Sequence, residues 1–204
     1  MGKAVDDDAT LLQLFARLPE RGRVKSRLAE ELDEQRALEI YLHCLRHNLE
    51  LLDSLEQDYQ LWIDRPGEHP LFDGRDIRLQ QGRDLGERMA HAINDGLQGH
   101  RRVLLIGSDC LDMNPGCLAR AAQRLEDHDL VLTPAEDGGF VLIGSRRPLP
   151  PNLFEGVAWG SEWVLRQTLE NALADGLAVA VLHPLKDIDR AADLAHYPLL
   201  AEYC

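Results

Sequence analysis

Asp109 has a carboxylate side chain for which the surrounding sequence indicates no structural role. It follows the apolar run Arg102-Val103-Leu104-Leu105-Ile106, which has the composition of a buried strand. Asn114 and Pro115 already supply the cap and the first-turn proline of the next expected helix. Carboxylate oxygens suit Mg²⁺ or Mn²⁺, which often take only one or two protein carboxylates and bridge to substrate phosphates. Asp109 is therefore a candidate metal ligand, the alternative being an aspartate that hydrogen-bonds its own turn.

A basic loop over residues 17–27 is the second candidate for a binding role. It holds five of the chain's 22 basic residues within eleven positions, although the chain as a whole is acidic. These five are Arg17, Arg21, Arg23, Lys25 and Arg27. Guanidinium forks and an ammonium group can bind a diphosphate, and Gly22 would let the backbone approach the anion. The pattern is neither a P-loop nor a Gly-x-Gly-x-x-Gly fingerprint, and a solvated charged loop is an equally good interpretation.

The segment Pro134-Ala135-Glu136-Asp137-Gly138-Gly139 separates two apolar runs. Asp-Gly in this setting is a strong signal for a β-hairpin, and we favour that structural interpretation. In a functional interpretation, Gly138 and Gly139 would leave room for a substrate to lie against the backbone. Glu136 or Asp137 would then contact the hydroxyl groups of a sugar or an acceptor.

Two further candidates lie in the C-terminal half of the chain. Asp189, in Lys186-Asp187-Ile188-Asp189, follows a predicted strand and would complete a metal site from across the sheet. It is equally the natural cap of a last helix, and both roles stay open. Trp159 precedes Gly160-Ser161 at an expected helix start and is a candidate for a pocket wall.

These side chains need a framework that holds them together. Short apolar runs predict strands, and apolar residues that recur with helical spacing predict helices. The expected strands cover residues 10–16, 59–63, 102–106, 130–133, 140–143 and 178–182, and the expected helices cover 33–55, 84–97, 114–126 and 161–175, with a last helix from about residue 189. This alternation predicts an α/β fold with a mostly parallel sheet covered on both faces. Ligands of such sheets bind at the carboxyl ends of the strands, where the candidates stand.

The length and composition of the chain limit the classes of function that it can have. The length of 204 residues fits one domain over residues 1–204, with a frayed start over residues 1–9. A formal charge of −13 disfavours nucleic acid as a partner, because binding to a phosphate backbone needs a broad basic surface. No apolar stretch is long enough to cross a bilayer, and an acidic cluster stands where a secretory signal would begin, so we expect a cytoplasmic protein. Four widely spaced cysteines predict reduced thiols rather than disulfides or a zinc site.

Six segments, taken in order, resemble a bacterial family of glycosyltransferase-A-type proteins. These are nucleotide-diphospho-sugar transferases once catalogued only as a domain of unknown function, and some relatives are linked to arsenosugar synthesis. The matching segments are Phe15-Ala16-Arg17 through Gly22-Arg23-Val24-Lys25-Ser26-Arg27-Leu28, Gly82-Arg83-Asp84-Leu85-Gly86-Glu87-Arg88-Met89, Gly107-Ser108-Asp109-Cys110, Pro134 through Gly144, Trp159-Gly160-Ser161 and Asp187-Ile188-Asp189. The resemblance covers nearly the whole chain. The family usually has Lys at Arg17, Pro at Leu111 and Thr-Pro at Arg190-Ala191.

The resemblance implies a three-layer α/β/α, Rossmann-like glycosyltransferase-A fold with a mostly parallel, mixed sheet. It implies a nucleotide held over the first strand, a metal ion at Asp109, and a donor or acceptor near Asp137, Gly138 and Gly139. The nucleotide and phosphate contacts would come from Phe15, Ala16, Arg17, Gly22, Arg23, Lys25, Arg27 and Gly82, and the substrate contacts from Glu136, Asp137, Gly138, Gly139 and Trp159. Asp109, Lys25 and Asp137 would be the catalytic residues, and Asp109 and Asp189 the ligands of Mg²⁺ or Mn²⁺.

Three functions fit this pattern. The leading hypothesis is metal-dependent glycosyl transfer from a nucleotide-sugar to a small-molecule acceptor. The same residues would serve a nucleotidyltransferase, in which Lys25 and Arg27 stabilise charge on a triphosphate while pyrophosphate leaves. A non-catalytic nucleotide-binding module is a third hypothesis, and the retained acidic and basic residues count against it.

Overall fold

A seven-stranded mixed sheet forms the centre of the computed structural model, which describes residues 10–198 and 200. The strand order is β3-β2-β1-β4-β6-β5-β7. The strands are β1 (Thr10–Ala16), β2 (Tyr59–Ile63), β3 (Ile77–Leu79), β4 (Arg102–Gly107), β5 (Leu130–Pro134), β6 (Phe140–Ser145) and β7 (Val179–Val181). Only β6 runs antiparallel to its neighbours β4 and β5. The sequence-based prediction of a mostly parallel α/β sheet is confirmed, while the expectation about residues 1–9 lies outside the described residues.

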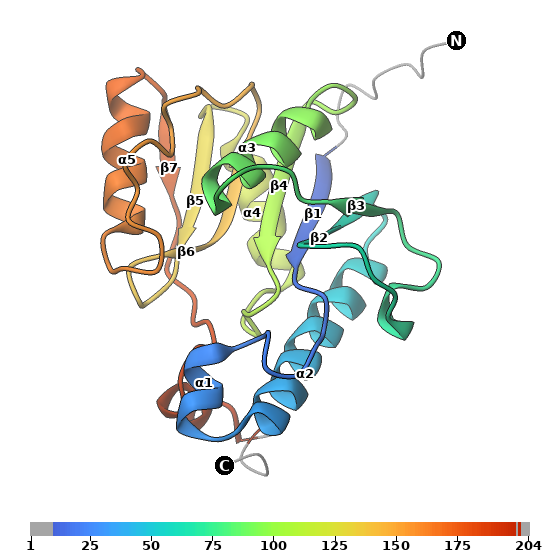
Figure 1. Cartoon of the computed structure of the whole chain (residues 1–204). Coiled ribbons are helices and arrows are strands. Elements are labelled where there is room, and N and C mark those ends of the chain that lie inside the picture. The colour runs from blue at the N-terminus through green and yellow to red at the C-terminus, as the bar shows by residue number, and fades with distance from the viewer. Residues whose placement is uncertain (1–9, 199, 201–204) are drawn as a thin grey trace.

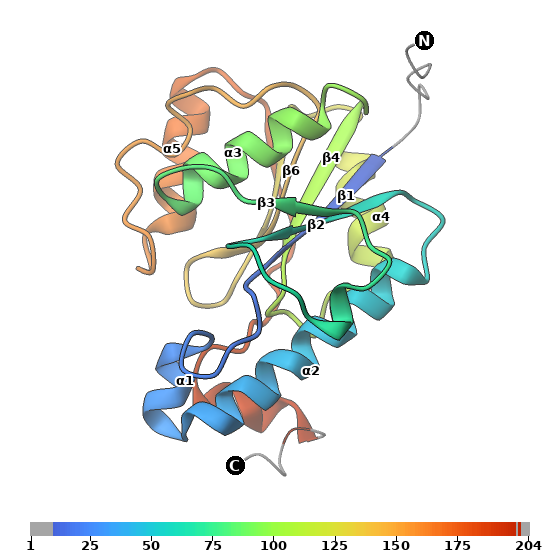
Figure 2. The same cartoon turned by 45° about the vertical axis from the view of Figure 1, so that its right-hand side comes forward.

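Helices cover both faces of the sheet and give the molecule three layers (Figure 1; Figure 2). The helices are α1 (Ser26–Glu31), α2 (Glu34–Asp53), α3 (Leu85–Gly96), α4 (Pro115–Arg124) and α5 (Val164–Ala174), with 3₁₀ turns η1 (Pro70–Phe72) and η2 (Ala191–His196). Helices α2 and α4 pack on one face through Leu45, Leu49 and Leu118. Helices α3 and α5 pack on the other through Ile93 and Ala172. The three-layer fold expected from the resemblance is therefore present.

The chain reverses its direction of travel across the sheet between β1 and β4. From β1 it proceeds to β2 and β3 on one side, and it then returns to place β4 on the other side of β1. A crevice forms at such a switch point because the connections leave the two neighbouring strands in opposite directions. Below this edge, α1, the first turns of α2 and η2 share a small core that includes Leu28, Ile40 and Ile188 (Figure 1).

Local signals set most of the helix boundaries. Asp33 caps α2 by accepting hydrogen bonds from the backbone N–H groups of Gln35 and Arg36, and Asp84 caps α3 in the same way. Asn114 Oδ1 accepts from Cys117 N at 3.1 Å, so the predicted cap of α4 is confirmed. Within the described residues, no helix is long and apolar enough to cross a membrane.

The structure corrects the predicted elements at several places. Helix α1, the turn η1 and strand β3 were not predicted, because they are short and few of their side chains are buried. The helix expected over residues 161–175 begins at Val164 rather than at Ser161, whose hydroxyl donates to the carbonyl of Ala158. The last predicted helix is the 3₁₀ turn η2, which begins at Ala191 rather than near Asp189.

Candidate functional site

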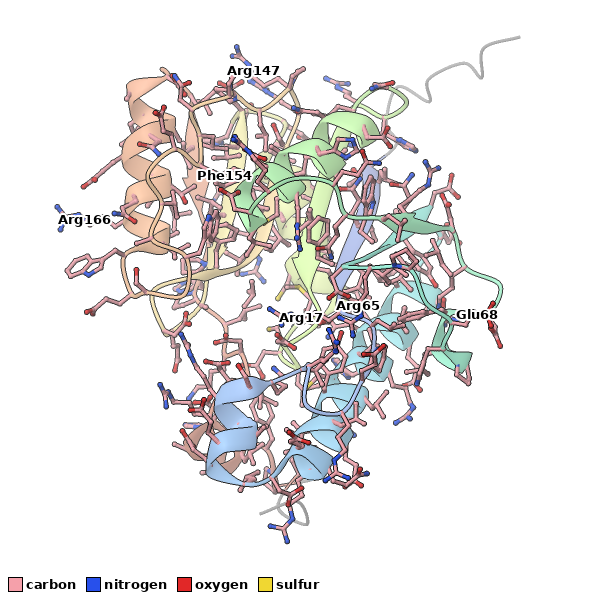
Figure 3. The ribbon with its side chains drawn as sticks, in the orientation of Figure 1. Arg17, Arg65, Glu68, Arg147, Phe154 and Arg166 are labelled. Atoms are coloured by element: carbon pink, nitrogen blue, oxygen red, sulfur yellow. The ribbon has the colours of Figure 1, made fainter. Side chains whose placement is uncertain are left out.

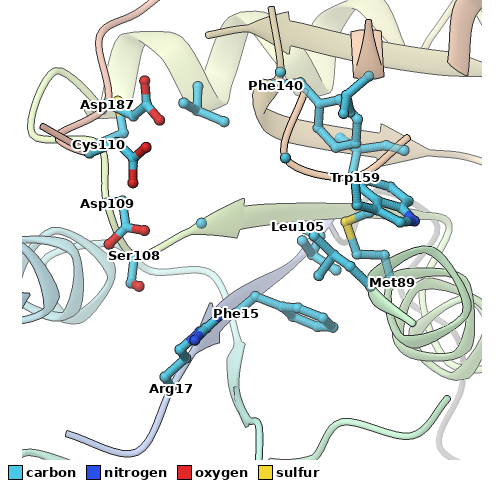
Figure 4. A pocket seen from close by; sticks show the side chains of 18 of the residues that line it. Phe15, Arg17, Met89, Leu105, Ser108, Asp109, Cys110, Phe140, Trp159 and Asp187 are labelled. Atoms are coloured by element: carbon cyan, nitrogen blue, oxygen red, sulfur yellow. The ribbon is translucent and has the colours of Figure 1, made fainter. Parts of the chain in front are cut away.

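A cavity of about 680 Å³ opens at the switch point between β1 and β4. Its walls come from the end of β1, the basic loop before α1, the loop after β4, the β5–β6 hairpin, the start of α3 and the segments around residues 159–161 and 187–189. Figure 4 shows Asp109 and Asp187 at one end, and Phe140, Trp159 and Met89 at the other. The cavity is therefore bipolar, with a charged end beside Asp109 and an apolar end against the sheet and α3.

Lys25 and Asp109 form an ion pair at the charged end. Lys25 Nζ lies 2.8 Å from Asp109 Oδ1, and it also donates a hydrogen bond to the carbonyl of Ile188. The Lys25 side chain is 3% exposed and that of Asp109 is 48% exposed. Burial lowers the pKa of Lys25, but the charge and hydrogen bond of Asp109, together with the charges of Cys44 and Asp189, outweigh burial, and the pKa lies above its ordinary value. Lys25 therefore remains a cation. Its backbone lies in the left-handed region, with φ 51°.

Arg27 forms the second pair, with Asp189. Arg27 Nη1 lies 2.7 Å from Asp189 Oδ2, and Nη2 donates to the carbonyl of Gly160 at 2.8 Å. The hydrogen bond to Asp189 raises the pKa of Arg27. Asp189 is not the cap of η2, because the N-cap residue is Arg190 and the Asp189 carboxylate accepts from Arg27 instead. Arg27 thus joins three loops that are far apart in the sequence.

A third carboxylate, Asp187, lines the cavity beside Asp137 and Asp109. Burial, together with the negative charges of Asp137 and Asp109, raises the pKa of Asp187 to about 6. Asp137 lies in the β5–β6 hairpin, where its Oδ1 accepts the Gly139 N–H at 2.8 Å. Three loops thus bring carboxylates close enough to repel one another, which favours a bound cation. Among the described residues, however, no three His, Cys, Asp or Glu side chains are arranged to hold a metal ion by themselves.

The apolar end has an aromatic wall. Trp159 packs on Phe154 with ring centroids 5.6 Å apart, and Phe15 stacks on Trp62 at 6.3 Å. Met89 of α3 and Leu105 of β4 complete this surface. A flat or apolar portion of a ligand would lose water contact here, which is favourable in itself.

The structure gathers many of the predicted site residues around the cavity. Those that line it are Phe15, Arg17, Lys25, Asp109, Asp137, Gly139, Trp159 and Asp189. Figure 3 shows Arg17 at the carboxyl end of β1, whereas Arg147 and Arg166 point outward at the periphery. The predicted metal ligands Asp109 and Asp189 both approach the same cavity, although each is already paired with a cation.

The structure does not place the other predicted site residues on the cavity lining. These are Ala16, Gly22, Arg23, Arg27, Gly82, Glu136 and Gly138. Arg23 pairs with Glu20 at 3.2 Å, and Glu136 lies 3.5 Å from the ammonium of Lys186. These two side chains are therefore directed by ion pairs outside the cavity.

Two of the predicted glycines have structural reasons of their own. A Cβ on Gly82 would lie 2.7 Å from Arg88 N, and one on Gly138 would lie 2.3 Å from the Glu162 carbonyl oxygen. Both glycines also have positive φ, at 146° and 93°. Close backbone approach thus explains them without a ligand.

The cavity also contains residues that the sequence-based prediction did not assign to the site. They are Ser26, Tyr41, Asp64, Gln80, Asp84, Leu85, Arg88, Met89, Leu105, Gly107, Ser108, Cys110, Phe140, Val141, Leu142, Ile143, Gly160, Ser161, Val164 and Asp187. Asp64 directly follows β2, so the strand-end rule that singled out Asp109 would have found it. Tyr41 holds the Arg17 backbone, whose N–H donates to the Tyr41 hydroxyl, and no local signal on α2 indicates this.

Comparisons with known proteins agree with this fold. A crystal structure from Desulfovibrio desulfuricans G20, of a protein proposed to be a nucleotide-diphospho-sugar transferase, has a TM-score of 0.84 and 32% identity, covering 94% of this chain and 87% of the other. A 4-diphosphocytidyl-2C-methyl-D-erythritol synthase from Anaerococcus prevotii DSM 20548 has a TM-score of 0.60 at 13% identity, with 97% and 100% covered. A CMP:2-keto-3-deoxy-manno-octonic acid synthetase complexed with CTP has a TM-score of 0.59 at 10% identity, with 96% and 100% covered. The last two show the fold alone, and no curated protein sequence matches.

A family model covers the middle of the chain. It matches residues 45–161, which include the loop of Asp109 and the β5–β6 hairpin. This match and the 32% identity over 94% of the chain confirm the resemblance on which the fold was expected. The chain belongs to the family described as uncharacterized protein conserved in bacteria (DUF2064).

Proposed function

We propose that this chain transfers a sugar from a nucleotide-sugar donor to a small-molecule acceptor, with a divalent metal ion as cofactor. One observation carries the proposal. A single cavity at the β1–β4 switch point is lined by the carboxylates of Asp109, Asp137 and Asp187 and by the basic groups of Arg17 and Lys25. The protein from Desulfovibrio desulfuricans G20, itself proposed to be a nucleotide-diphospho-sugar transferase, supports this class.

The charge of the cavity fits a divalent cation. Among the described residues, six aspartates and three basic residues line it. A diphosphate would be repelled by this surface unless a cation accompanied it. Asp109 and Asp189 would hold the ion, with Asp187 beside them, and the phosphates and water would supply its other ligands. When bound, Mg²⁺ or Mn²⁺ would act as a Lewis acid toward the diphosphate leaving group.

The side chains around the cavity would divide the remaining work. Lys25 and Arg17 would stabilise negative charge on the nucleoside diphosphate as the anomeric carbon–oxygen bond breaks. The acceptor oxygen would form the new bond to that carbon, and its proton would pass to the carboxylate of Asp137. Gly139 and Trp159 would bound the sugar or acceptor next to Asp137.

Nucleotidyl transfer is the second candidate. The solved structures that share the fold at 10% and 13% identity are a CMP:2-keto-3-deoxy-manno-octonic acid synthetase complexed with CTP and a 4-diphosphocytidyl-2C-methyl-D-erythritol synthase. The same cavity would then take a nucleoside triphosphate and a phosphorylated partner, and pyrophosphate would leave. The two reactions differ in the donor and in the released product.

A ligand panel tests the proposal and separates the candidates. Uridine, guanosine, adenosine and cytidine nucleotides and nucleotide-sugars would be added with and without Mn²⁺, and the melting temperature recorded. We expect one nucleotide-sugar to raise the melting temperature more with Mn²⁺ than without it. Incubation with that donor would release a nucleoside diphosphate, whereas released pyrophosphate would identify the nucleotidyltransferase. If no nucleotide stabilises the protein, the transferase proposal fails.

Asp109→Asn supplies the test of the metal site. We expect this variant to lose the Mn²⁺-dependent part of the shift. Asp112→Asn is the matched control, because Asp112 lies in the same loop but accepts the Lys186 N–H at 3.4 Å outside the cavity lining. Retention of the full Mn²⁺-dependent shift in Asp109→Asn would remove Asp109 from the metal site.

A further inference from the structure

Arg17 and Arg88 are distinguished from the other basic residues at the cavity by their surroundings. The ammonium of Lys25 is already paired with Asp109, and Arg27 with Asp189. Among the described residues, neither Arg17 nor Arg88 has a carboxylate within ion-pair distance, although both line the cavity. The cavity therefore holds two guanidinium groups whose charge no carboxylate of the described residues neutralises.

Helix α3 shows why Arg88 is left without a carboxylate. Its neighbour Glu87 is taken by Arg83, whose Nε lies 2.8 Å from Glu87 Oε1 and whose backbone N–H donates to Oε2 at 2.8 Å. Asp84 is occupied as the helix cap and accepts the Glu87 N–H at 2.8 Å. Both acidic side chains within one turn of Arg88 are thus committed to other partners.

The backbone orients the Arg88 side chain. Arg88 Nε donates to the carbonyl of Gly82 at 3.2 Å, which leaves its two terminal nitrogens for other partners. The close packing of Gly82 against Arg88 N, which excludes any Cβ at position 82, fixes this loop on α3. The guanidinium is therefore attached at its inner nitrogen and presents its terminal nitrogens as a fork, the geometry that binds a phosphate through two parallel hydrogen bonds.

Arg17, which follows β1, is held in place through its backbone. Its backbone N–H donates to the Tyr41 hydroxyl at 2.8 Å, and that hydroxyl donates to the Arg17 carbonyl at 2.8 Å. The Arg17 side chain makes one long hydrogen bond, from Nη1 to the carbonyl of Arg23 at 3.3 Å. The strand end and α2 thus fix the base of this side chain while its charge remains available.

We propose that Arg88, together with Arg17, binds a phosphate group of the substrate. The proposal rests on the proposed function and deepens it by dividing the basic residues into two kinds. Lys25 and Arg27 also hold carboxylates of the site in position through their ion pairs, whereas Arg17 and Arg88 serve the anion alone. The phosphate comes from the nucleotide or from the acceptor, and both sources present the same oxygens to the two guanidinium groups.

The test compares Arg88→Gln with Arg83→Gln. The two arginines lie five residues apart on one segment, but the Arg83 side chain is 91% exposed and paired with Glu87. Binding of inorganic pyrophosphate, of a nucleoside and of the matching nucleoside diphosphate would be measured by calorimetry at low salt in the presence of Mn²⁺, with melting temperatures as a check of folding. We expect Arg88→Gln to weaken pyrophosphate binding at least tenfold, and Arg83→Gln to change it less than twofold. Nucleoside binding should be unchanged in both variants, and Arg88→Lys should recover part of the loss.

Each result decides the proposal. If Arg88→Gln also weakens binding of the nucleoside diphosphate, the bound phosphate is that of the nucleotide. If it weakens binding of pyrophosphate alone, the bound phosphate is that of the acceptor. Equal pyrophosphate affinity in Arg88→Gln and the wild type, or no pyrophosphate binding by the wild type, overturns the proposal. If the wild type binds pyrophosphate but no nucleotide, and only Arg88→Gln loses pyrophosphate affinity, the anion site stands and the transferase function is rejected. If Arg88→Gln binds nucleotide and pyrophosphate as the wild type does, the anion site is rejected and the transferase function stands.

Discussion

The ammonium of Lys25 and the carboxylate of Asp109 lie 2.8 Å apart, but the two partners are buried to very different extents. Lys25 is enclosed, with the carbonyl of Ile188 as its other partner, while nearly half of the Asp109 side chain meets solvent. Loss of one partner of an ion pair costs most when the remaining charge is buried. The pair is therefore asymmetric, and the two single substitutions should differ.

Asp109→Ala should lower the free energy of unfolding by about 2–4 kcal/mol, because it leaves the buried Lys25 ammonium without a counter-charge. Lys25→Met should lower it less, by about 1 kcal/mol, because water can solvate the exposed part of the Asp109 carboxylate, although its Oδ1 is buried. Urea denaturation of the two variants at neutral pH measures the difference. Equal losses, or a larger loss in Lys25→Met, would show that burial of Lys25 does not control the stability of this pair.

Gly138 and Gly139 are adjacent, yet the structure gives them different roles. Gly138→Ala should destabilise the protein by about 2 kcal/mol or more, because φ is 93° and the new Cβ would lie 2.3 Å from the Glu162 carbonyl oxygen. Gly139→Ala should cost less than about 1 kcal/mol, since the new Cβ would meet only the Asp137 carboxylate, at 3.1 Å. Gly139 lines the cavity, so its substitution should instead weaken ligand binding.

Melting temperatures and donor binding measured on both glycine variants check this contrast. A stable Gly138→Ala protein would mean that the hairpin does not need the close approach to Glu162. A Gly139→Ala protein that binds the donor like the wild type would place the substrate elsewhere in the cavity.

Asp129 should make the protein less stable in acid. Its pKa lies below the ordinary value of 3.8 because its carboxylate accepts the Ala178 N–H and pairs with Arg146. A group whose pKa is lowered by folding stabilises the native state above its unfolded pKa and loses that contribution as the pH falls through the folded pKa. The contribution should be complete above about pH 5 and decline below about pH 4.

Asp129→Asn isolates this contribution. It should reduce stability at pH 7, and the difference from the wild type should shrink as the pH falls below about 4. Urea midpoints of both proteins between pH 7 and pH 3 measure it. A difference that is constant over this range would mean that Asp129 does not titrate with a lowered pKa.

Elements with a regular apolar pattern were predictable, and those without one were not. Helix α2 has a continuous buried stripe, and β4 is buried along nearly its whole length. Helix α1 buries only Leu28 among six residues, and all three residues of β3 are exposed. Neither segment has a period that a sequence reading could detect, because tertiary contacts rather than local pattern hold it.

The candidate site was predictable where a residue stands at a strand end. Asp109 and Arg17 were found in this way, and both line the cavity. The pairing of Arg27 with Asp189 spans 162 positions, so no spacing in the sequence indicates it. Arg88 was not predicted from the sequence because its segment has the form of a helix start. Only the contacts of Arg83 and Glu87 in the structure show that Arg88 has no acidic partner on its own helix.

Arg27 should control the mobility of the segment that carries Trp159. Its guanidinium joins Asp189 to the Gly160 carbonyl, and Gly160 lies in the cavity wall between Trp159 and Ser161. Arg27→Gln would remove the hydrogen bond to Gly160, worth about 1 kcal/mol of local stability, so that amides of this segment should exchange with solvent roughly fivefold faster. Global stability should change little, because the pair is partly exposed.

Hydrogen exchange at the Ser161 amide, which donates to the Ala158 carbonyl at 3.2 Å, measures this opening. Arg78→Gln is the matched control, because Arg78 forms a similarly exposed pair with Asp76 at the β3 edge of the sheet, and it should leave the exchange rate unchanged. Exchange that is equally fast in both variants would attribute the effect to general destabilisation. Exchange at the wild-type rate in Arg27→Gln would show that the segment is held by the packing of Trp159 on Phe154 rather than by Arg27.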